Sequence, residues 1–147
     1  MVRSSFIGML IAASLFFSCK TKKSATTEMY HSNSEIENVI LKTELNISEM
    51  KSNYKIDSIA INKDILSVFV NYSGGCQKHK FELLFNGMYA KSLPPQATLY
   101  LNHISNDDLC KKQIFQEVRF NIASVLNEKY TEIYITVGEF KIKYTKK

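Results

Sequence analysis

The sequence predicts an all-β fold, a single antiparallel β-sandwich of immunoglobulin-like type or a small barrel. Two observations carry this prediction. From Tyr54 onward, about seven short segments alternate apolar and polar residues, and turn signals separate them every eight to twelve residues. The nine Phe and eight Tyr residues, with no Trp, are enough to fill the core of such a domain.

Each strand follows from this alternation, because successive side chains of a strand point to opposite faces. Two polar or glycine-containing steps, Asn62-Lys63-Asp64 and Gly138-Glu139, predict hairpin turns, and Asn86-Gly87 is a third turn signal. The stretch 36–50 fits either a helix or an edge strand, and we favour the strand. The remaining predicted strands are residues 56–61, 65–72, 81–86, 97–103, 114–120, 132–137 and 140–144.

The N-terminus predicts export. Arg3 precedes an apolar stretch, residues 6–17, that is too short for a transmembrane helix and is followed at once by polar residues. We interpret residues 1–18 as a lipoprotein signal peptide, residues 19–34 as a flexible tether, and residues 35–147 as the β-sandwich domain. The small residue Ser18 before Cys19 predicts that Cys19 carries the lipid and anchors the chain in the membrane.

The net charge of +5 is modest, and much of the positive excess lies at the two ends of the mature chain. Lysines that follow Cys19 would lie against anionic headgroups. The middle of the chain has no basic stripe with stacking aromatic residues, so we expect no nucleic-acid partner. The expected partners are the membrane, through the lipid anchor, and an envelope protein.

Chemistry is concentrated at the two spacings Cys76-x2-His79 and His103-x6-Cys110. Strand parity places His79 on the face of Phe81 and His103 on the apolar face of the strand that it closes. If the two strands are antiparallel neighbours, all four side chains converge on one rim of the domain. An additional strand within residues 86–97 would separate them.

Three interpretations of this cluster remain open. In the first, Cys76 and Cys110 form a disulfide, and the histidines are bonded to loop carbonyls or to Asp107 or Asp108. Export to an oxidising compartment favours this interpretation. Alternatively, all four residues bind zinc or copper through tetrahedral N/S coordination. In the third interpretation, a Cys–His dyad acts as a catalytic nucleophile, but neither cysteine has an evident oxyanion partner.

Other candidate groups are few. Asp107-Asp108 is either a cation site or a solvated turn. Arg119 is either an anion contact or a surface residue, and His31 falls in the predicted tether. None of them forms an adequate catalytic constellation, so we expect no enzyme.

Several separated elements of the chain resemble a family of uncharacterised bacterial lipoproteins of Bacteroidetes type. The elements are Gly74-Gly75-Cys76 with His79 and Phe81, then Pro94-Pro95-Gln96, then His103 with Asp108 and Cys110, and finally Phe120-Asn121-Ile122. The resemblance covers roughly residues 54–137, and at position 121 such proteins often carry Asp. It implies an exported lipoprotein without a known activity. The chain also resembles lipoproteins that face the periplasm from the outer membrane, because the run after Cys19 lacks the acidic residues associated with surface display.

The expected function is therefore that of a lipid-anchored cell-envelope protein with a non-enzymatic structural or partner-binding role. The alternative is a periplasmic zinc- or copper-binding protein that uses the Cys/His rim. The expected disulfide and the metal site exclude one another, because a thiol that has been oxidised to a disulfide is no longer available as a thiolate ligand.

Overall fold

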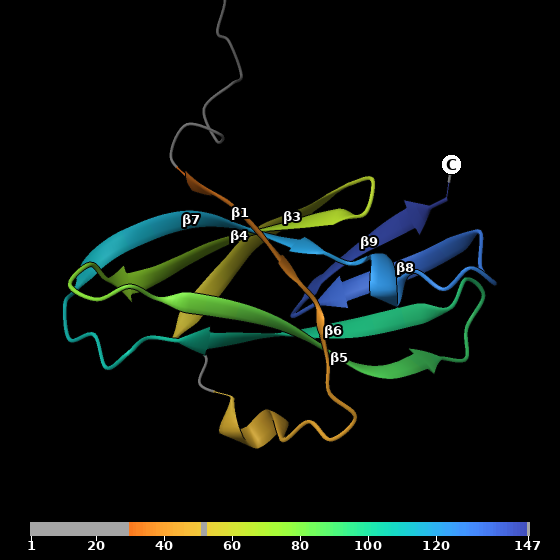
Figure 1. The fold of residues 1–147 in the computed structure, drawn as a ribbon, viewed down its shortest axis with the longest axis horizontal. Helices are drawn as coiled ribbons and strands as arrows, with labels where there is room; N and C mark the ends of the chain where they lie inside the picture. Colours follow the sequence, from red (N-terminus) through yellow and green to blue (C-terminus); the bar gives the residue numbers. More distant parts are fainter. Residues whose placement is uncertain (1–29, 51–52, 147) are drawn as a thin grey trace, which may run out of the picture.

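A computed structural model of the chain describes residues 30–50 and 53–146 (Figure 1). These residues form strands and two single-turn 3-10 helices, and contain no α-helix. The elements are β1 (His31–Asn38), β2 (Ile40–Leu41), η1 (Ile47–Glu49), β3 (Tyr54–Asn62), β4 (Ile65–Gly74), β5 (Lys80–Ala90), β6 (Gln96–Ile104), β7 (Lys112–Asn121), η2 (Ala123–Val125), β8 (Glu132–Val137) and β9 (Phe140–Thr145).

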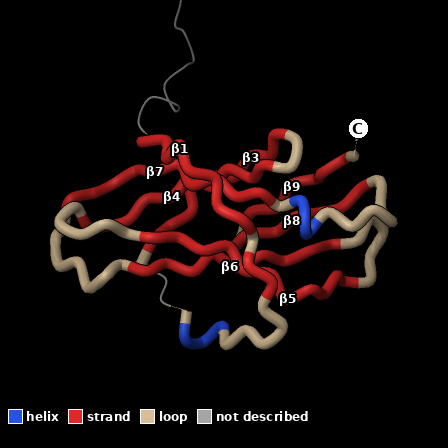
Figure 2. Tube along the Cα trace, in the orientation of Figure 1, coloured by secondary structure: helices blue, strands red, loops and turns tan. Residues whose placement is uncertain are grey.

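The strands form two sheets, with the orders β1-β7-β4-β3 and β2-β5-β6-β8-β9, which is compatible with a β-sandwich. The all-β prediction is confirmed. The expectation of a purely antiparallel arrangement is wrong, because β1 pairs with β7, β2 with β5, and β6 with β8 in parallel. Figure 2 shows that many loops gather at two opposite ends of the strands.

Alternation along the strands builds the core from both sheets. In β4, Leu66, Val68 and Val70 are fully buried, as the alternation predicts. The other sheet contributes residues such as Leu83, Leu99 and Ile135 to the same apolar cluster. Burial of each such side chain stabilises the fold by about 1.5–3 kcal/mol relative to exposure.

The turn signal Asn86-Gly87 predicted the end of a strand, but no strand ends there. The strand β5 continues to Ala90, and its register with β6 shifts between Phe85 and Tyr89. Gly87 adopts φ +79°, which glycine reaches without steric cost, and so permits this bulge. No additional strand therefore separates β5 from β6 within residues 86–97, all of which the structure describes. The strands β5 and β6 are antiparallel neighbours.

The N-terminal described segment connects the two sheets. The strand β1 begins at His31, so residues 31–34 belong to a strand and not to the predicted tether. After β1 pairs with β7, Val39 donates its N–H to the carbonyl oxygen of Asn121, and β2 then joins β5 in the other sheet. The preferred strand interpretation of the 36–50 stretch is confirmed for its first half, while its second half contains η1.

The signal peptide, Cys19 and residues 20–29 lie outside the described residues. Within the described ranges, no helix has the length and apolar character that crossing a membrane requires.

Candidate functional site: the Cys–His–Asp rim

Two loops that pass between the sheets lie side by side at one end of the strands (left in Figures 1 and 2). One loop connects β4 to β5 and carries Cys76 and His79; the other connects β6 to β7 and carries Asp108 and Cys110. Phe81 of β5 is the register partner of His103 of β6, so the start of β5 meets the end of β6. The convergence predicted from strand parity is therefore present. We call these five residues, Cys76, His79, His103, Asp108 and Cys110, the rim.

The two cysteines of the rim lie at disulfide-bonding distance. Their Cα atoms are 5.8 Å apart, within the usual range for a disulfide, and they are separated by 34 positions in the sequence. Closing a loop of this length removes chain entropy from the unfolded state, which corresponds to about 3.8 kcal/mol of stability in the chain-entropy model. Cys76 is exposed, so this connection forms the outer surface of the rim.

The carboxylate of Asp108 lies within 4.8 Å of the sulfur atoms of both cysteines and connects the two loops a second time. Its Oδ2 accepts the backbone N–H groups of Gly75, Cys76 and Gln77 at 2.8, 3.0 and 2.9 Å. Its Oδ1 accepts the N–H of Cys110 at 2.9 Å. The side chain has no solvent exposure, so these donors replace its water shell.

These hydrogen bonds favour the ionised form of Asp108. The N–H of Gln77 has the largest effect and that of Cys110 the next, and together with the other donors they hold the pKa of Asp108 far below its usual range. The sequence interpretation of Asp107-Asp108 as a solvated turn is therefore wrong for Asp108, whereas Asp107 is exposed.

Gly74 and Gly75 make this approach of the two loops possible. A Cβ atom on Gly74 would lie 2.7 Å from the ring of His79 and 3.1 Å from Oδ2 of Asp108, so a larger residue would displace both side chains. Gly75 adopts φ +114°, which turns its N–H toward the carboxylate at no steric cost. The paired glycines before Cys76 therefore serve the Asp108 site.

The two histidines continue the hydrogen-bonded chain into the core. Nε2 of His79 lies 3.1 Å from Oδ2 of Asp108, and its Nδ1 lies 2.9 Å from Nε2 of His103. Because the ionised carboxylate only accepts, the Nε2–H of His79 donates to it. In a neutral pair, Nδ1 of His79 is then the acceptor, and the Nε2–H of His103 donates to it.

Aromatic side chains enclose both imidazoles. Tyr72 stacks on His79 with ring centroids 4.6 Å apart, and Phe81 stacks on His103 at 4.5 Å. Tyr54 approaches His103 edge-on at 5.6 Å and donates its hydroxyl to the carbonyl of Leu101. Burial, followed by the nearby His79, lowers the pKa of His103 from 6.5 to about 4. The structure thus keeps His103 neutral at physiological pH.

The predicted metal ligands do not form one compact set. Among the described residues, potential ligand atoms within 4.8 Å of one another belong to Cys76, Asp108 and Cys110, without either histidine. Both nitrogens of His79 are occupied by Asp108 and His103. The Cys2His2 metal site remains a prediction, and the geometry gives it less support than it gives to the disulfide.

Sequence reasoning missed the role of Asp108 as the centre of the rim. The pattern His103-x4-Asp108-x-Cys110 was visible, but the acceptance of backbone N–H groups leaves no trace in residue type. It also placed His31 in the tether, whereas His31 lies exposed in β1. Arg119 lies on β7 and borders a groove beside the rim.

No family model matches this chain, and no curated protein matches its sequence. Solved structures do resemble the fold. A protein from Parabacteroides distasonis ATCC 8503 named as toxin-related has a TM-score of 0.52 and 22% identity, over 75% of this chain and 61% of that chain. A DUF1344 protein of unknown function from Bacteroides vulgatus ATCC 8482 has a TM-score of 0.52 and 19% identity, over 75% and 55% of the two chains. A NigD-like immunity protein from Bacteroides caccae ATCC 43185 has a TM-score of 0.53 and 13% identity, over 76% and 60%.

The shared property is the fold. All three structures come from Bacteroidetes, the group in which the sequence resemblance lies, but they leave the particular motifs of that resemblance untested. This chain spans 55–61% of the length of these structures. Identities of this size establish nothing about activity.

The buried His103 predicts a loss of stability in acid. Unfolded His103 takes up a proton near pH 6.5, whereas folded His103 resists protonation until about pH 4. Between these values the unfolded chain binds more protons, so the free energy of unfolding falls as the pH is lowered. His103→Gln keeps a donor for His79 without titrating, and its stability should vary less across this interval in urea-denaturation curves.

His31→Gln is the matched control, because it removes an exposed histidine of β1. It should retain the pH dependence of the parent chain. Equal pH dependence in the parent chain and in His103→Gln would contradict the neutral, buried state assigned to His103.

Proposed function

We propose that this chain is a lipid-anchored protein of the cell envelope with a non-enzymatic structural or partner-binding role. The observation that carries the proposal is the internal use of every reactive group of the rim. The cysteines lie at bonding distance from each other, and the Asp108 carboxylate accepts backbone N–H groups from both loops. The side chain of His79 is 1% exposed and that of Asp108 is not exposed at all.

A catalytic nucleophile or general base must reach its substrate, directly or through one water. The rim does not offer such access, because aromatic rings cover both imidazoles and the loops cover the carboxylate. Its chemistry is better suited to holding two loops in one conformation. In this role the cysteines form a disulfide, which is the ordinary fate of such a pair in an exported protein.

The proposed location in the cell envelope is supported by Cys19 and by the two cysteines of the rim. Acylation of Cys19 would anchor the chain, and the lysines that follow it suit an anionic headgroup surface. A disulfide between Cys76 and Cys110 suits the periplasmic side of the outer membrane. The immunity-protein name of the similar Bacteroides caccae structure is compatible with a partner-binding role, by analogy of fold alone.

Replacement of Cys19 tests the anchor. Cys19→Ala removes the acylation site, and we expect the protein to move from the membrane fraction to the soluble fraction of the envelope. Ser24→Ala, five positions further along, leaves Cys19 in place and should stay with the membranes. Fractionation followed by immunoblotting measures both. Persistence of Cys19→Ala in the membranes would show that the anchor lies elsewhere.

The state of the rim cysteines separates the structural role from metal binding. For the domain purified from the periplasm, we expect an intact mass two hydrogens below that of the reduced chain, no free thiol at Cys76 or Cys110, and no bound metal. Mass spectrometry, thiol counting and metal analysis measure these quantities. Two free thiols with one stoichiometric zinc or copper ion would refute the structural rim and establish the metal-binding alternative.

A further inference from the structure

An apolar side chain projects from the rim between two residues that are fixed in place. Leu109 is 90% exposed. It follows Asp108, whose side chain is fully buried, and it precedes Cys110, which lies at bonding distance from Cys76. The backbone of Leu109 is therefore held on both sides, while its side chain extends into solvent.

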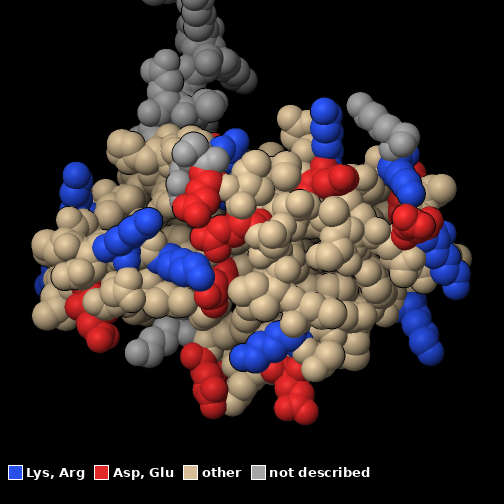
Figure 3. All heavy atoms as spheres, viewed as in Figure 1, with Lys and Arg blue, Asp and Glu red and all other residues tan. Residues whose placement is uncertain are grey.

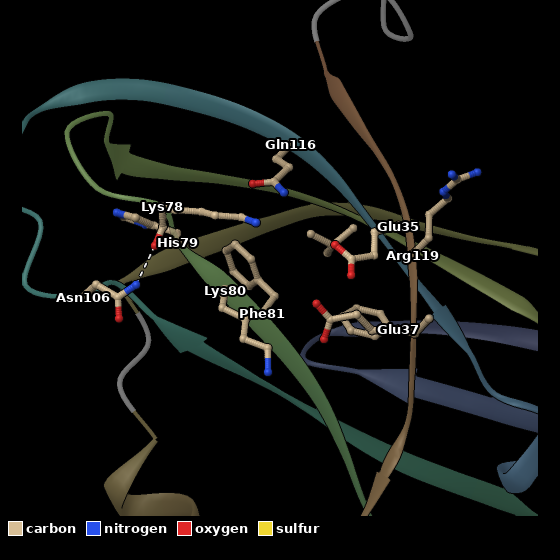
Figure 4. A pocket seen from close by; sticks show the side chains of 11 residues that line it. Glu35, Glu37, Lys78, His79, Lys80, Phe81, Asn106, Gln116 and Arg119 are labelled. Carbon is tan, nitrogen blue, oxygen red and sulfur yellow. Dashed lines mark hydrogen bonds between the residues drawn. The ribbon is translucent and has the colours of Figure 1, made fainter.

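The two rim loops are also connected to each other near this leucine. Asn106 donates from its side chain to the carbonyl of Lys78 at 2.6 Å, as Figure 4 shows. At the base of the loops, Gly74 of β4 is the register partner of Lys112 of β7. Loops that are fixed in this way lose little conformational freedom when they bind, which reduces the cost of binding.

Three exposed lysines accompany Leu109. Lys78 belongs to the β4–β5 loop, Lys111 to the β6–β7 loop, and Lys112 is the first residue of β7. We call Leu109 with these three lysines the rim tip. On the face drawn in Figure 3, basic side chains project from the end of the molecule at which the rim lies (left).

Little exposed negative charge opposes these lysines. The side chain of Asp108 has no solvent exposure, and its oxygens accept backbone N–H groups from both loops. Of the carboxylates in the two rim loops, Asp107 alone is exposed. The surface of the rim tip therefore has an excess of positive charge around one apolar side chain.

This composition fits a membrane surface better than a protein surface. Protein interfaces bury about 800 Å² on each partner and are depleted in Lys. In the two rim loops, which the structure describes in full, Leu109 is the one large apolar side chain that is exposed. Lysines at an anionic lipid surface, with an apolar side chain below the headgroups, are a usual basis of peripheral membrane binding.

The described chain begins on the same side of the domain. His31 and Ser32, at the start of β1, border a cavity together with Lys78 of the rim tip. The register of β1 with β7 then advances to Asn121, so β1 leads away from the rim. The segment that follows the proposed anchor therefore enters the domain beside the rim.

The length of that segment keeps the rim tip within reach of the membrane. Ten residues separate Cys19 from Tyr30, and a chain of this length spans at most about 40 Å. A tether of limited length raises the effective concentration of the domain at the lipid surface. A small binding surface is then sufficient, because it does not have to capture the protein from solution.

A leucine with neighbouring lysines also occurs at the opposite end of the strands. Leu93 is fully exposed in the loop between β5 and β6, Lys91 lies two positions before it, and Lys129 borders the same cavity. The start of β1 does not border this cavity. The two ends have similar residue types and differ in their relation to the anchor, so they form a matched pair for an experiment.

We propose that the rim tip rests on an anionic lipid surface and orients the domain on the membrane. Leu109 reaches below the headgroups, and Lys78, Lys111 and Lys112 lie against the lipid phosphates. This inference rests on the proposed lipid anchor, and it adds which end of the domain is turned toward the membrane.

A single tryptophan reports this contact, because the chain contains no Trp of its own. The mature lipidated chain with Leu109→Trp is reconstituted in vesicles of phosphatidylcholine with phosphatidylglycerol. We expect a blue-shifted emission and quenching by brominated acyl chains, and neither of these in vesicles of phosphatidylcholine alone. Leu93→Trp is the matched control, and its emission should remain that of a tryptophan in water in both kinds of vesicle.

Charge reversal tests the lysines of the rim tip. Lys111→Glu with Lys112→Glu, combined with Leu109→Trp, should lower the ratio of inserted to free tips by about tenfold or more, since each lysine near an anionic surface contributes roughly a factor of five. The same reversal at the opposite end, Lys91→Glu with Lys129→Glu, should leave the quenching unchanged. These side chains are exposed, so the substitutions leave the core intact.

Three results would overturn the proposal: no quenching of Leu109→Trp, equal quenching of Leu93→Trp, or quenching that does not depend on phosphatidylglycerol. If Leu109→Trp stays in water on anionic vesicles and shifts instead with poly-glutamate, the rim tip binds an acidic protein and not a membrane.

The outcomes remain distinct from those for the proposed function. Flotation of the vesicles shows whether the chain is anchored, whatever the tryptophan reports. A chain that floats with the vesicles, while Leu109→Trp stays in water, would refute the membrane contact of the rim alone. A chain that does not float would refute the proposed lipid anchor.

Discussion

The burial of one ionised carboxylate organises this domain. The side chain of Asp108 has no contact with solvent, and its two oxygens accept four backbone N–H groups from two loops that belong to different parts of the chain. A buried charge is costly unless it is surrounded by donors, so both loops must adopt the conformation that supplies them. The position of His79, the requirement for Gly74 and the approach of Cys76 to Cys110 all depend on this arrangement.

The rim connects the two sheets at the end where each sheet passes its chain to the other. The strand β4 leads into β5 through one loop and β6 leads into β7 through the other, so the rim fixes both transitions. Aromatic stacking on His79 and His103 extends the same connection into the core.

Much of the fold was predictable because strand alternation is a local property. The segment of β4 from Leu66 to Val70 alternates as expected and is buried as expected. The parallel pairing of β1 with β7 was not predictable, because parallel partners are distant in sequence and no turn residue marks them. The prediction of a turn at Asn86-Gly87 was wrong because the same two residues suit both a hairpin turn and a bulge with positive φ.

Part of the candidate site was likewise predictable from the sequence, and part of it was not. Parity and the ends of two strands were enough to bring His79 and His103 together and to direct both imidazoles inward. The partners of Asp108 were not predictable, because they are backbone groups that every residue except proline possesses. The glycines before Cys76 are recognisable from the sequence as permissive for a turn. The space that Gly74 leaves for His79 and the carboxylate is created only when the two loops meet in the folded domain.

The ionisation of Asp108 is the most direct test of this account. The chemical shift of its carboxyl carbon, followed by NMR as the pH is lowered, reports the protonation of that group alone. We expect the shift to stay at its ionised value well below pH 3.8, the ordinary midpoint of an aspartate, for as long as the domain remains folded. A titration centred near the ordinary value in the folded domain would contradict the buried carboxylate on which the rim depends.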